Sequence, residues 1–167
     1  MKTEKPLYPN PEYIEELVRI VNQSPYPVHM HMRLKSIGLD TATIELKAGG
    51  CHLQPYGILH GGVIATLIDT ATFWSVYMRI PENDGLVNID LKLNYLTPVK
   101  DGMLRAEGTA IRSGRSISYA ESKVLNEKEE LVAHGTSTLL TLPGKGLKIS
   151  HKKFIPESFM KIYEKQV

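Results

Sequence analysis

Residues 54–69 of the chain read QPYGILHGGVIATLID, and two features of this stretch need a physical reason. Gly61 and Gly62 open what the apolar run 63–78 predicts to be a buried helix, although glycine is a poor helix former. Asp69 then places a carboxylate among Ile, Leu and Ala, where removing a charge from water is costly. We therefore expect the glycines to expose backbone amides and the aspartate to have a specific role.

The size and composition of the chain predict one soluble domain. At 167 residues it can bury a core unaided, and its formal charge of +2 gives no reason to expect nucleic acid as a partner. The single cysteine, Cys51, permits neither an intrachain disulfide nor a thiolate cluster for zinc, so we expect no metal and a reducing, cytoplasmic location. The start of the chain lacks an apolar signal core, and the apolar run is too short and too interrupted to span a bilayer.

The first half of the chain predicts a helix and a hairpin. Asn10 is a candidate N-cap with Pro11 at the first helical position, and Pro25 and Pro27 should end this helix. Residues 28–38 and 41–49 alternate between apolar and polar side chains, which indicates two paired strands. After a loop comes the apolar helix, which is apolar on most sides and must therefore be wrapped by other elements.

The second half predicts strands alone. Four runs of period two, 86–98, 102–114, 116–128 and 130–143, are separated by turns too short for a crossover helix, so the strands should be antiparallel. The expected fold class is α+β, with an antiparallel sheet wrapped around one long central helix. We divide the chain into a helical segment (1–28), the main domain (29–142) and a polar, basic tail (143–167) with at most a short helix near 157–165.

The stretch GILHGGVIATLIDTA (57–71), with Gln54 before it and IDLKLNYLTPV (89–99) after it, resembles the hotdog-fold acyl-CoA thioesterases of the phenylacetate-degradation (PaaI-like) subfamily. The resemblance covers roughly residues 37–142. It implies a dimer with one continuous sheet, often paired again into a tetramer, and an acyl-CoA substrate with no other cofactor.

The resemblance also implies roles for individual residues. The oxyanion-binding amide falls on Gly61, the general base or nucleophile on Asp69, and the positioning amide side chain on Gln54. His60 matches the histidine of the motif, which orients the loop more often than it carries a proton. Where many relatives have Ser or Thr, this chain has Asn88, which could hold a water as a hydroxyl does.

The spacing of the two unusual features adds a prediction of its own. A helix N-terminus stabilises negative charge through its free amides and its dipole, and glycine lets a carbonyl approach them closely. Asp69 lies about 12 Å further along the same helix, whereas a reacting carbonyl must lie within roughly 3 Å of both groups. We therefore expect two half-sites, in which Gly61 and Gln54 of one chain meet Asp69 and Asn88 of the other.

Other residues are weaker candidates for the site. Arg112, Arg115 and Ser116 lie in a predicted tight turn that could contact a phosphate of CoA or be an ordinary exposed turn. Thr66 or Thr70 could bond the carboxylate or a water, or simply bond back to the helix. An aromatic and methionine cluster on the helix could line an acyl pocket or belong to the core: Phe73, Trp74, Tyr77 and Met78.

Two other functions remain open at the level of sequence. Hotdog domains also serve as acyl-CoA binding or sensing modules, which would have no need of a buried carboxylate, and no DNA-binding segment is recognisable here. Hydratase or dehydratase chemistry would need a histidine and an acid placed together on the ligand, and the motifs associated with it are absent.

Overall fold

The computed structural model describes residues 7–157 and residue 159. Its main body is a six-stranded antiparallel sheet in the order β2-β3-β5-β6-β7-β4. The strands are β2 (Met32–Ile37), β3 (Thr41–Ala48), β4 (Gly85–Tyr95), β5 (Gly102–Ser113), β6 (Ile117–Leu125) and β7 (Leu131–Leu142).

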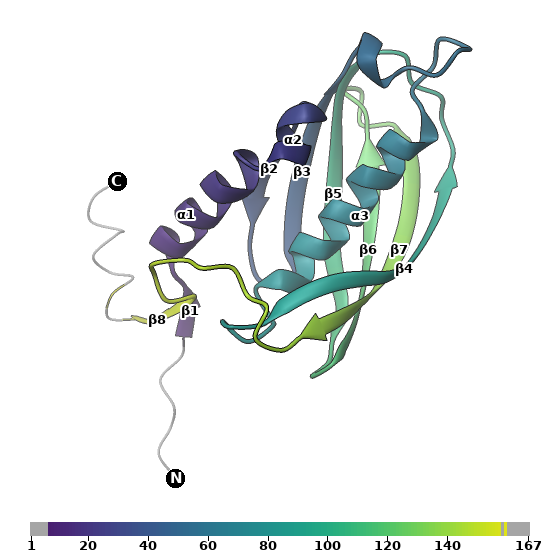
Figure 1. The fold of residues 1–167 in the computed structure, drawn as a ribbon. Helices are drawn as coiled ribbons and strands as arrows, with labels where there is room; N and C mark the ends of the chain where they lie inside the picture. The colour runs from purple at the N-terminus through teal and green to yellow at the C-terminus, as the bar shows by residue number, and fades with distance from the viewer. Residues whose placement is uncertain (1–6, 158, 160–167) are drawn as a thin grey trace.

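The long helix α3 (Gly61–Tyr77) lies across one face of this sheet, as Figure 1 shows. Its sheet-facing side chains, among them Leu67, Ile68 and Ala71, are fully buried. The close approach is visible at Gly108 of β5, where any Cβ would collide with the Ala71 carbonyl. The predicted α+β architecture, a sheet against one long helix, is confirmed.

The opposite side of α3 is only partly covered. Ala65, Thr66, Asp69, Thr70 and Phe73 are half-buried and recur at helical spacing, so they form a stripe along the helix that the sheet covers only in part. The sheet thus packs on one side of α3, and within the single chain this stripe is left partly open to a partner or ligand.

The first helix follows the sequence prediction closely. Helix α1 (Pro11–Asn22) begins with Asn10 as N-cap, whose side-chain oxygen accepts from the Glu12 amide. Tyr13, Leu17 and Val21 are its buried face.

The segment after α1 differs from the sequence prediction. Residues 28–31 were expected in a strand, but Pro25–His29 form a second short helix, α2, and β2 begins only at Met32. Pro25 and Pro27 end α1 as expected, yet Pro25 also occupies the first position of α2, where proline is well tolerated.

The connection from β4 to β5 is the second difference. The turn at Asp101 and Gly102 was expected to join neighbouring strands, but β4 pairs with β7, and β5 lies between β3 and β6. The connecting segment passes the start of α3 instead, where the Leu59 amide donates to the Val99 carbonyl. Strand β4 is thereby left at the edge of the sheet.

The two ends of the described chain meet beside α1. Strand β1 (Leu7–Pro9) pairs with β8 (Phe154–Pro156) in a separate two-stranded sheet that the sequence did not indicate. A 3-10 turn, η1 (Gly50–His52), precedes the loop to α3. The short helix expected near 157–165 lies largely outside the described residues. Within the described ranges, no helix has the length and apolar character needed to cross a bilayer.

Candidate functional site

Asp69 and Asn88 meet between α3 and β4. The Asn88 Nδ2 donates to Asp69 Oδ1 at 2.7 Å and approaches the Asp69 backbone carbonyl at 3.2 Å and Ser137 Oγ at 3.0 Å. Because two acceptors of Asp69 face this nitrogen, the orientation of the amide is fixed. Its other end, Asn88 Oδ1, is buried and has no hydrogen-bond partner among the described residues. An acceptor is thus held free next to a carboxylate.

The environment of Asp69 shifts its acidity. Burial raises the pKa of the Asp69 carboxyl above its ordinary value, and the hydrogen bond from Asn88 opposes this shift in part. A carboxylate with a raised pKa accepts a proton more readily than an exposed aspartate does. Asp69 is also on the open stripe of α3, so a substrate or water can reach it.

The N-terminus of α3 offers a backbone amide. His60 is the N-cap, and its Nδ1 accepts from the Gly62 amide at 2.9 Å, while the Val63 amide bonds back to the His60 carbonyl. No bond from the Gly61 amide to another described residue is found. This amide, at the positive end of the helix dipole, is therefore available to an anion or a carbonyl oxygen.

Tyr95 at the end of β4 packs on Gly61. Its hydroxyl donates to the Gly61 carbonyl at 3.1 Å, and a Cβ on Gly61 would lie only 2.9 Å from that hydroxyl. Sequence reasoning missed Tyr95, because nothing local in the strand 86–98 tells which residue reaches the helix. A side chain at position 61 would therefore force the exposed Tyr95 ring to shift.

Gln54 and Gly61 line the same cavity of about 400 Å³, with Tyr95 on its wall. The sequence-predicted residues therefore fall into two groups: Gln54, His60 and Gly61 at the start of α3, and Asp69 with Asn88 two turns further along. Eight residues of helix separate the groups by about 12 Å. Within one chain, the two groups cannot act on the same carbonyl.

The residues suggested for CoA lie elsewhere on the sheet. Arg112 is at the end of β5, and Arg115 and Ser116 form the exposed turn that follows. Across the sheet, Ser113 pairs with Ser118, Ser118 with Leu139, and Leu139 with Asn88. Ser113, next to this turn, is therefore three strand spacings, or about 14 Å, from Asn88. The structure does not bring this turn together with Asp69 or Gly61 of the same chain.

The aromatic residues of α3 divide between a cavity and the core. Phe73, Trp74 and Tyr77 line a second cavity, while Met78 is fully buried. Thr66 bonds the Tyr26 hydroxyl at 2.7 Å rather than its own helix, and the back-bonding threonine is Thr72.

A cluster of potential metal ligands adjoins the first of these groups, because the His60 amide donates to the His52 carbonyl. Ligand atoms of His31, Cys51 and His52 are within 4.8 Å of one another. His52, however, accepts from the Gly49 amide through Nδ1 and bonds the Met30 carbonyl through Nε2, so both nitrogens are engaged. The two remaining groups are exposed, which makes the cluster a poor metal site.

The sequence model of the thioesterase superfamily matches residues 56–133, a stretch that contains all of α3, β4, β5 and β6. Residues 56–133 belong to the thioesterase superfamily. The hotdog fold and the resemblance to its thioesterases are thereby confirmed at the level of the superfamily.

Individual relatives agree with this assignment. A thioesterase structure from Haemophilus influenzae superimposes with a TM-score of 0.72 at 26% identity, covering 83% of this chain and 94% of that one. A 1,4-dihydroxy-2-naphthoyl-CoA hydrolase of Listeria monocytogenes is 26% identical over 65% of this chain and 88% of its own length. A proofreading thioesterase of Klebsiella pneumoniae is 32% identical over 45% of this chain and 55% of its own. These matches support thioester hydrolysis as the general activity of the domain.

Proposed function

We propose that this protein is an acyl-CoA thioesterase whose active sites form between two copies of the chain. The observation that carries the proposal is the Asp69–Asn88 pair. Burial raises the pKa of the Asp69 carboxyl, and the amide oxygen of Asn88 has no partner among the described residues. The pair lies on the open stripe of a helix whose N-terminus presents a free amide. The CoA hydrolase among the relatives supports a CoA thioester as the substrate.

The chemistry follows from these groups. Asp69, held by Asn88, can take a proton from a water molecule as the oxygen of that water attacks the thioester carbon. The Gly61 amide stabilises the negative charge that forms on the carbonyl oxygen. When the carbon–sulfur bond breaks, CoA leaves as a thiolate and receives the proton from Asp69.

The edge strand supports assembly through β4. This strand is eleven residues long, pairs only with β7, and exposes the apolar side chains of Val87, Ile89 and Tyr95. A long apolar edge strand is a template for pairing with another chain. Antiparallel pairing of two β4 strands about a two-fold axis near Leu91 would place Tyr95 and Gly61 of one copy beside Asn88 and Asp69 of the other.

The test is release of free thiol from a panel of acyl- and aryl-CoA esters. We expect hydrolysis by the unchanged protein and a loss of about 10²-fold or more in kcat for Asp69→Asn, the range typical of a general base. Asp101→Asn is the matched control, because Asp101 is exposed in the loop before β5. If Asp69→Asn kept its full rate, the assignment of the base would be wrong. Tight binding of acyl-CoA without turnover would instead identify a sensing module.

A further inference from the structure

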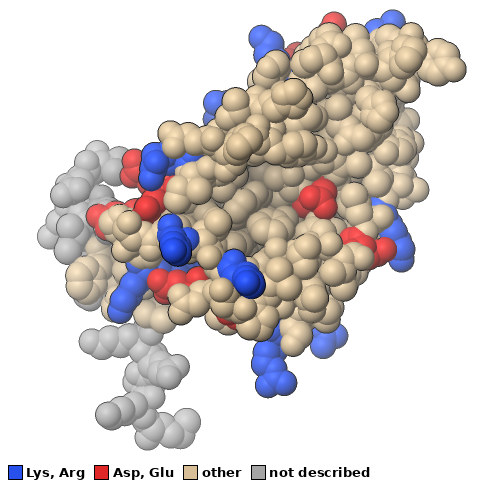
Figure 2. Space-filling view, viewed as in Figure 1, with Lys and Arg blue, Asp and Glu red and all other residues tan. Residues whose placement is uncertain are grey.

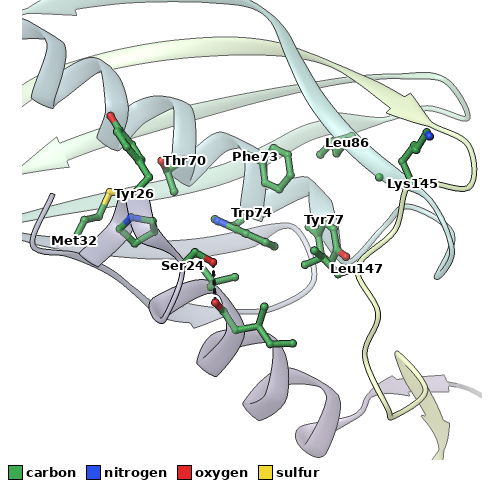
Figure 3. Close-up of a pocket in the computed structure, with 14 residues that line it drawn as sticks. Ser24, Tyr26, Met32, Thr70, Phe73, Trp74, Tyr77, Leu86, Lys145 and Leu147 are labelled. Atoms are coloured by element: carbon green, nitrogen blue, oxygen red, sulfur yellow. Dashed lines mark hydrogen bonds between the residues drawn. The ribbon is translucent and has the colours of Figure 1, made fainter. Parts of the chain in front are cut away.

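The second cavity lies between α1, α2, α3, the start of β4 and the segment that follows β7 (Figure 3). Its volume is about 350 Å³. Eight of its lining residues lie outside the stretch that matches the superfamily, so the cavity is built largely by the two extensions of this chain. These residues are Ile20, Val21, Ser24, Tyr26, Pro27, Met32, Lys145 and Leu147.

The wall formed by α3 is aromatic and closely packed. The rings of Phe73 and Trp74 meet edge to face at 4.8 Å, and Trp74 meets Tyr77 in the same way at 4.9 Å. The Ser24 hydroxyl, which also lines the cavity, already donates to the Ile20 carbonyl. Figure 2 shows that the surface over α2 and α3 is mostly uncharged, while charged side chains gather toward the tail. Lys145 and the Tyr77 hydroxyl, which has no partner among the described residues, also line the cavity, but its α3 wall is mainly aromatic and suits an apolar group.

The cavity begins next to the proposed catalytic carboxylate. Thr70 follows Asp69 directly, and Phe73 lies one helical turn beyond Asp69, about 6 Å along the helix axis. Both belong to the half-buried stripe of α3 that also carries Asp69. A thioester whose carbonyl lies at Asp69 can direct its acyl chain along this stripe.

The far end of the cavity is closed by the tail strap, which we define as residues 144–153. Its first residues are held by the loop before β4, since the Gly144 amide donates to Asp84 Oδ1 and the Gly146 amide to the Asn83 carbonyl, each at 2.9 Å. Leu147 follows and faces the cavity (Figure 3).

The second half of the tail strap is fixed on the other side of the cavity. The Ser150 amide donates to Glu16 of α1, and the Asn10 amide donates to the Lys153 carbonyl. The Lys153 ammonium is 2% exposed and donates to the Tyr77 and Ile80 carbonyls, which caps the C-terminal end of α3. Because both halves are anchored, the end wall at Leu147 has a fixed position.

We propose that this cavity receives the acyl group of the substrate and that the tail strap limits it to a compact apolar acyl group. The proposal rests on the function proposed above. A cavity of about 150 Å³ accommodates benzene, so the present one holds about two rings or a chain of about eight to ten carbons. Octanoyl- and aryl-CoA esters fit these dimensions, and palmitoyl-CoA exceeds them.

The first experiment measures kcat/KM across acetyl-, hexanoyl-, octanoyl-, dodecanoyl- and palmitoyl-CoA. Leu147→Ala opens the end wall, and we expect the dodecanoyl-to-octanoyl ratio to rise by about tenfold, because each lost steric conflict in an apolar pocket changes selectivity on that scale. Ser24→Phe fills the cavity and should raise KM for octanoyl-CoA more than KM for acetyl-CoA. Leu39→Ala is the matched control, since Leu39 is 38% exposed, close to the 41% of Leu147, and lies in the β2–β3 turn.

The second experiment does not depend on turnover. Trp74 is the only tryptophan of the chain and lines the cavity, so its fluorescence reports occupancy. In the Asp69→Asn variant, octanoyl-CoA should change this fluorescence, CoA alone should not, and Ser24→Phe should abolish the response. If turnover occurs but Leu147→Ala leaves the chain-length profile unchanged and Trp74 does not respond, the acyl pocket is wrong. If Trp74 responds but no ester is hydrolysed, the pocket stands and the catalytic function is wrong.

Discussion

The Asn88 side chain holds the Asp69 carboxylate through a 2.7 Å hydrogen bond that joins the edge strand β4 to the middle of α3. This bond opposes the effect of burial on the carboxyl, so it lowers a pKa that desolvation raises. Asn88 thus acts on the acidity and the position of Asp69, while its own amide oxygen stays buried without a partner among the described residues.

Replacing Asn88 should move the pH dependence of the reaction. In Asn88→Ala the opposing hydrogen bond is gone, so the pKa of Asp69 rises further and the acid limb of the kcat profile shifts to higher pH. We also expect kcat to fall by about 10- to 100-fold, because the Asp69 carboxylate loses the hydrogen bond that holds it in place. A pH–rate profile measures both effects, and Asn94→Ala, an exposed position on the same strand, is the control. If the acid limb did not shift, Asn88 would have no effect on the pKa of Asp69, and this prediction would be wrong.

Asp69 should also cost stability near neutral pH. Burial raises its folded-state pKa, so the folded protein holds this proton more tightly than the unfolded chain does. The stability that Asp69 contributes is then fully present below the unfolded pKa and is lost as the pH rises through the folded pKa. We expect Asp69→Asn to have a higher Tm than the unchanged protein at pH 7 and no such advantage at pH 4. Thermal melts at both pH values decide the point, and equal Tm values at pH 7 would contradict it.

Gly61 has two possible reasons to be glycine, and a double variant separates them. Gly61→Ala brings a Cβ to 2.9 Å from the Tyr95 hydroxyl, so Tyr95 must move. We expect kcat/KM to fall by about tenfold or more, in the range reported for impaired oxyanion sites. Adding Tyr95→Ala should restore any lost Tm without restoring the rate. Full recovery of the rate in the double variant would show that the glycine serves packing against Tyr95 alone.

The sequence predicted the local features of this fold better than its long-range ones. The cap at Asn10 and the long helix from Gly61 follow from signals within a few residues, and both are as expected. The position of β4 at the edge does not follow from its own residues, since pairing with β7 depends on which apolar faces meet in the folded chain. The same holds for the β1–β8 pair, whose strands lie at opposite ends of the described chain.

The candidate site shows the same division. Asp69 and Gly61 stand out because each breaks a local rule, a charge in an apolar helix and a glycine at its start. The sequence analysis already grouped Asp69 with Asn88 in one half-site, but it could not give the β-bulge between Asn88 and Asp90. The contact of Tyr95 with Gly61 was also out of reach, because it depends on the tertiary fold alone. The acyl cavity was likewise hidden, because its walls come from segments on both sides of the matched domain.

Lys153 should stabilise the fold increasingly as the pH rises. Burial lowers its pKa to about 8, so between this value and the unfolded value near 10.5 the unfolded chain binds more protons than the folded one. Stability contributed by Lys153 therefore grows from about pH 8 to about pH 10.5. We expect Lys153→Met to lose roughly 1–3 kcal/mol at pH 7, since two helix-end carbonyls lose their donor. The deficit should be larger at pH 10.

Urea unfolding at pH 7 and pH 10 measures this difference. The exposed neighbour provides the control, because Lys152→Met removes the same side chain without touching α3. A deficit that shrinks at pH 10 would mean that the ammonium form is the stabilising one in the folded protein.

Complementation between two inactive variants tests whether the two groups of site residues serve the same carbonyl across the dimer. Asp69→Asn keeps Gly61 and Gln54 intact, and Gln54→Ala keeps Asp69 and Asn88. Each should be impaired as a homodimer. In a mixed dimer, the intact half of one chain meets the intact half of the other at one of the two interfaces, while the second interface carries both changes.

The expected yield of this experiment is fixed by symmetry. Random exchange gives half mixed dimers with one intact site in two, so co-refolding equal amounts should recover about a quarter of the unmodified activity. A double variant, Gln54→Ala with Asp69→Asn in the same chain, mixed with unmodified protein controls for exchange. If each site were built within one chain, every site in the first mixture would carry a change, and the activity would stay at the average of the two homodimers.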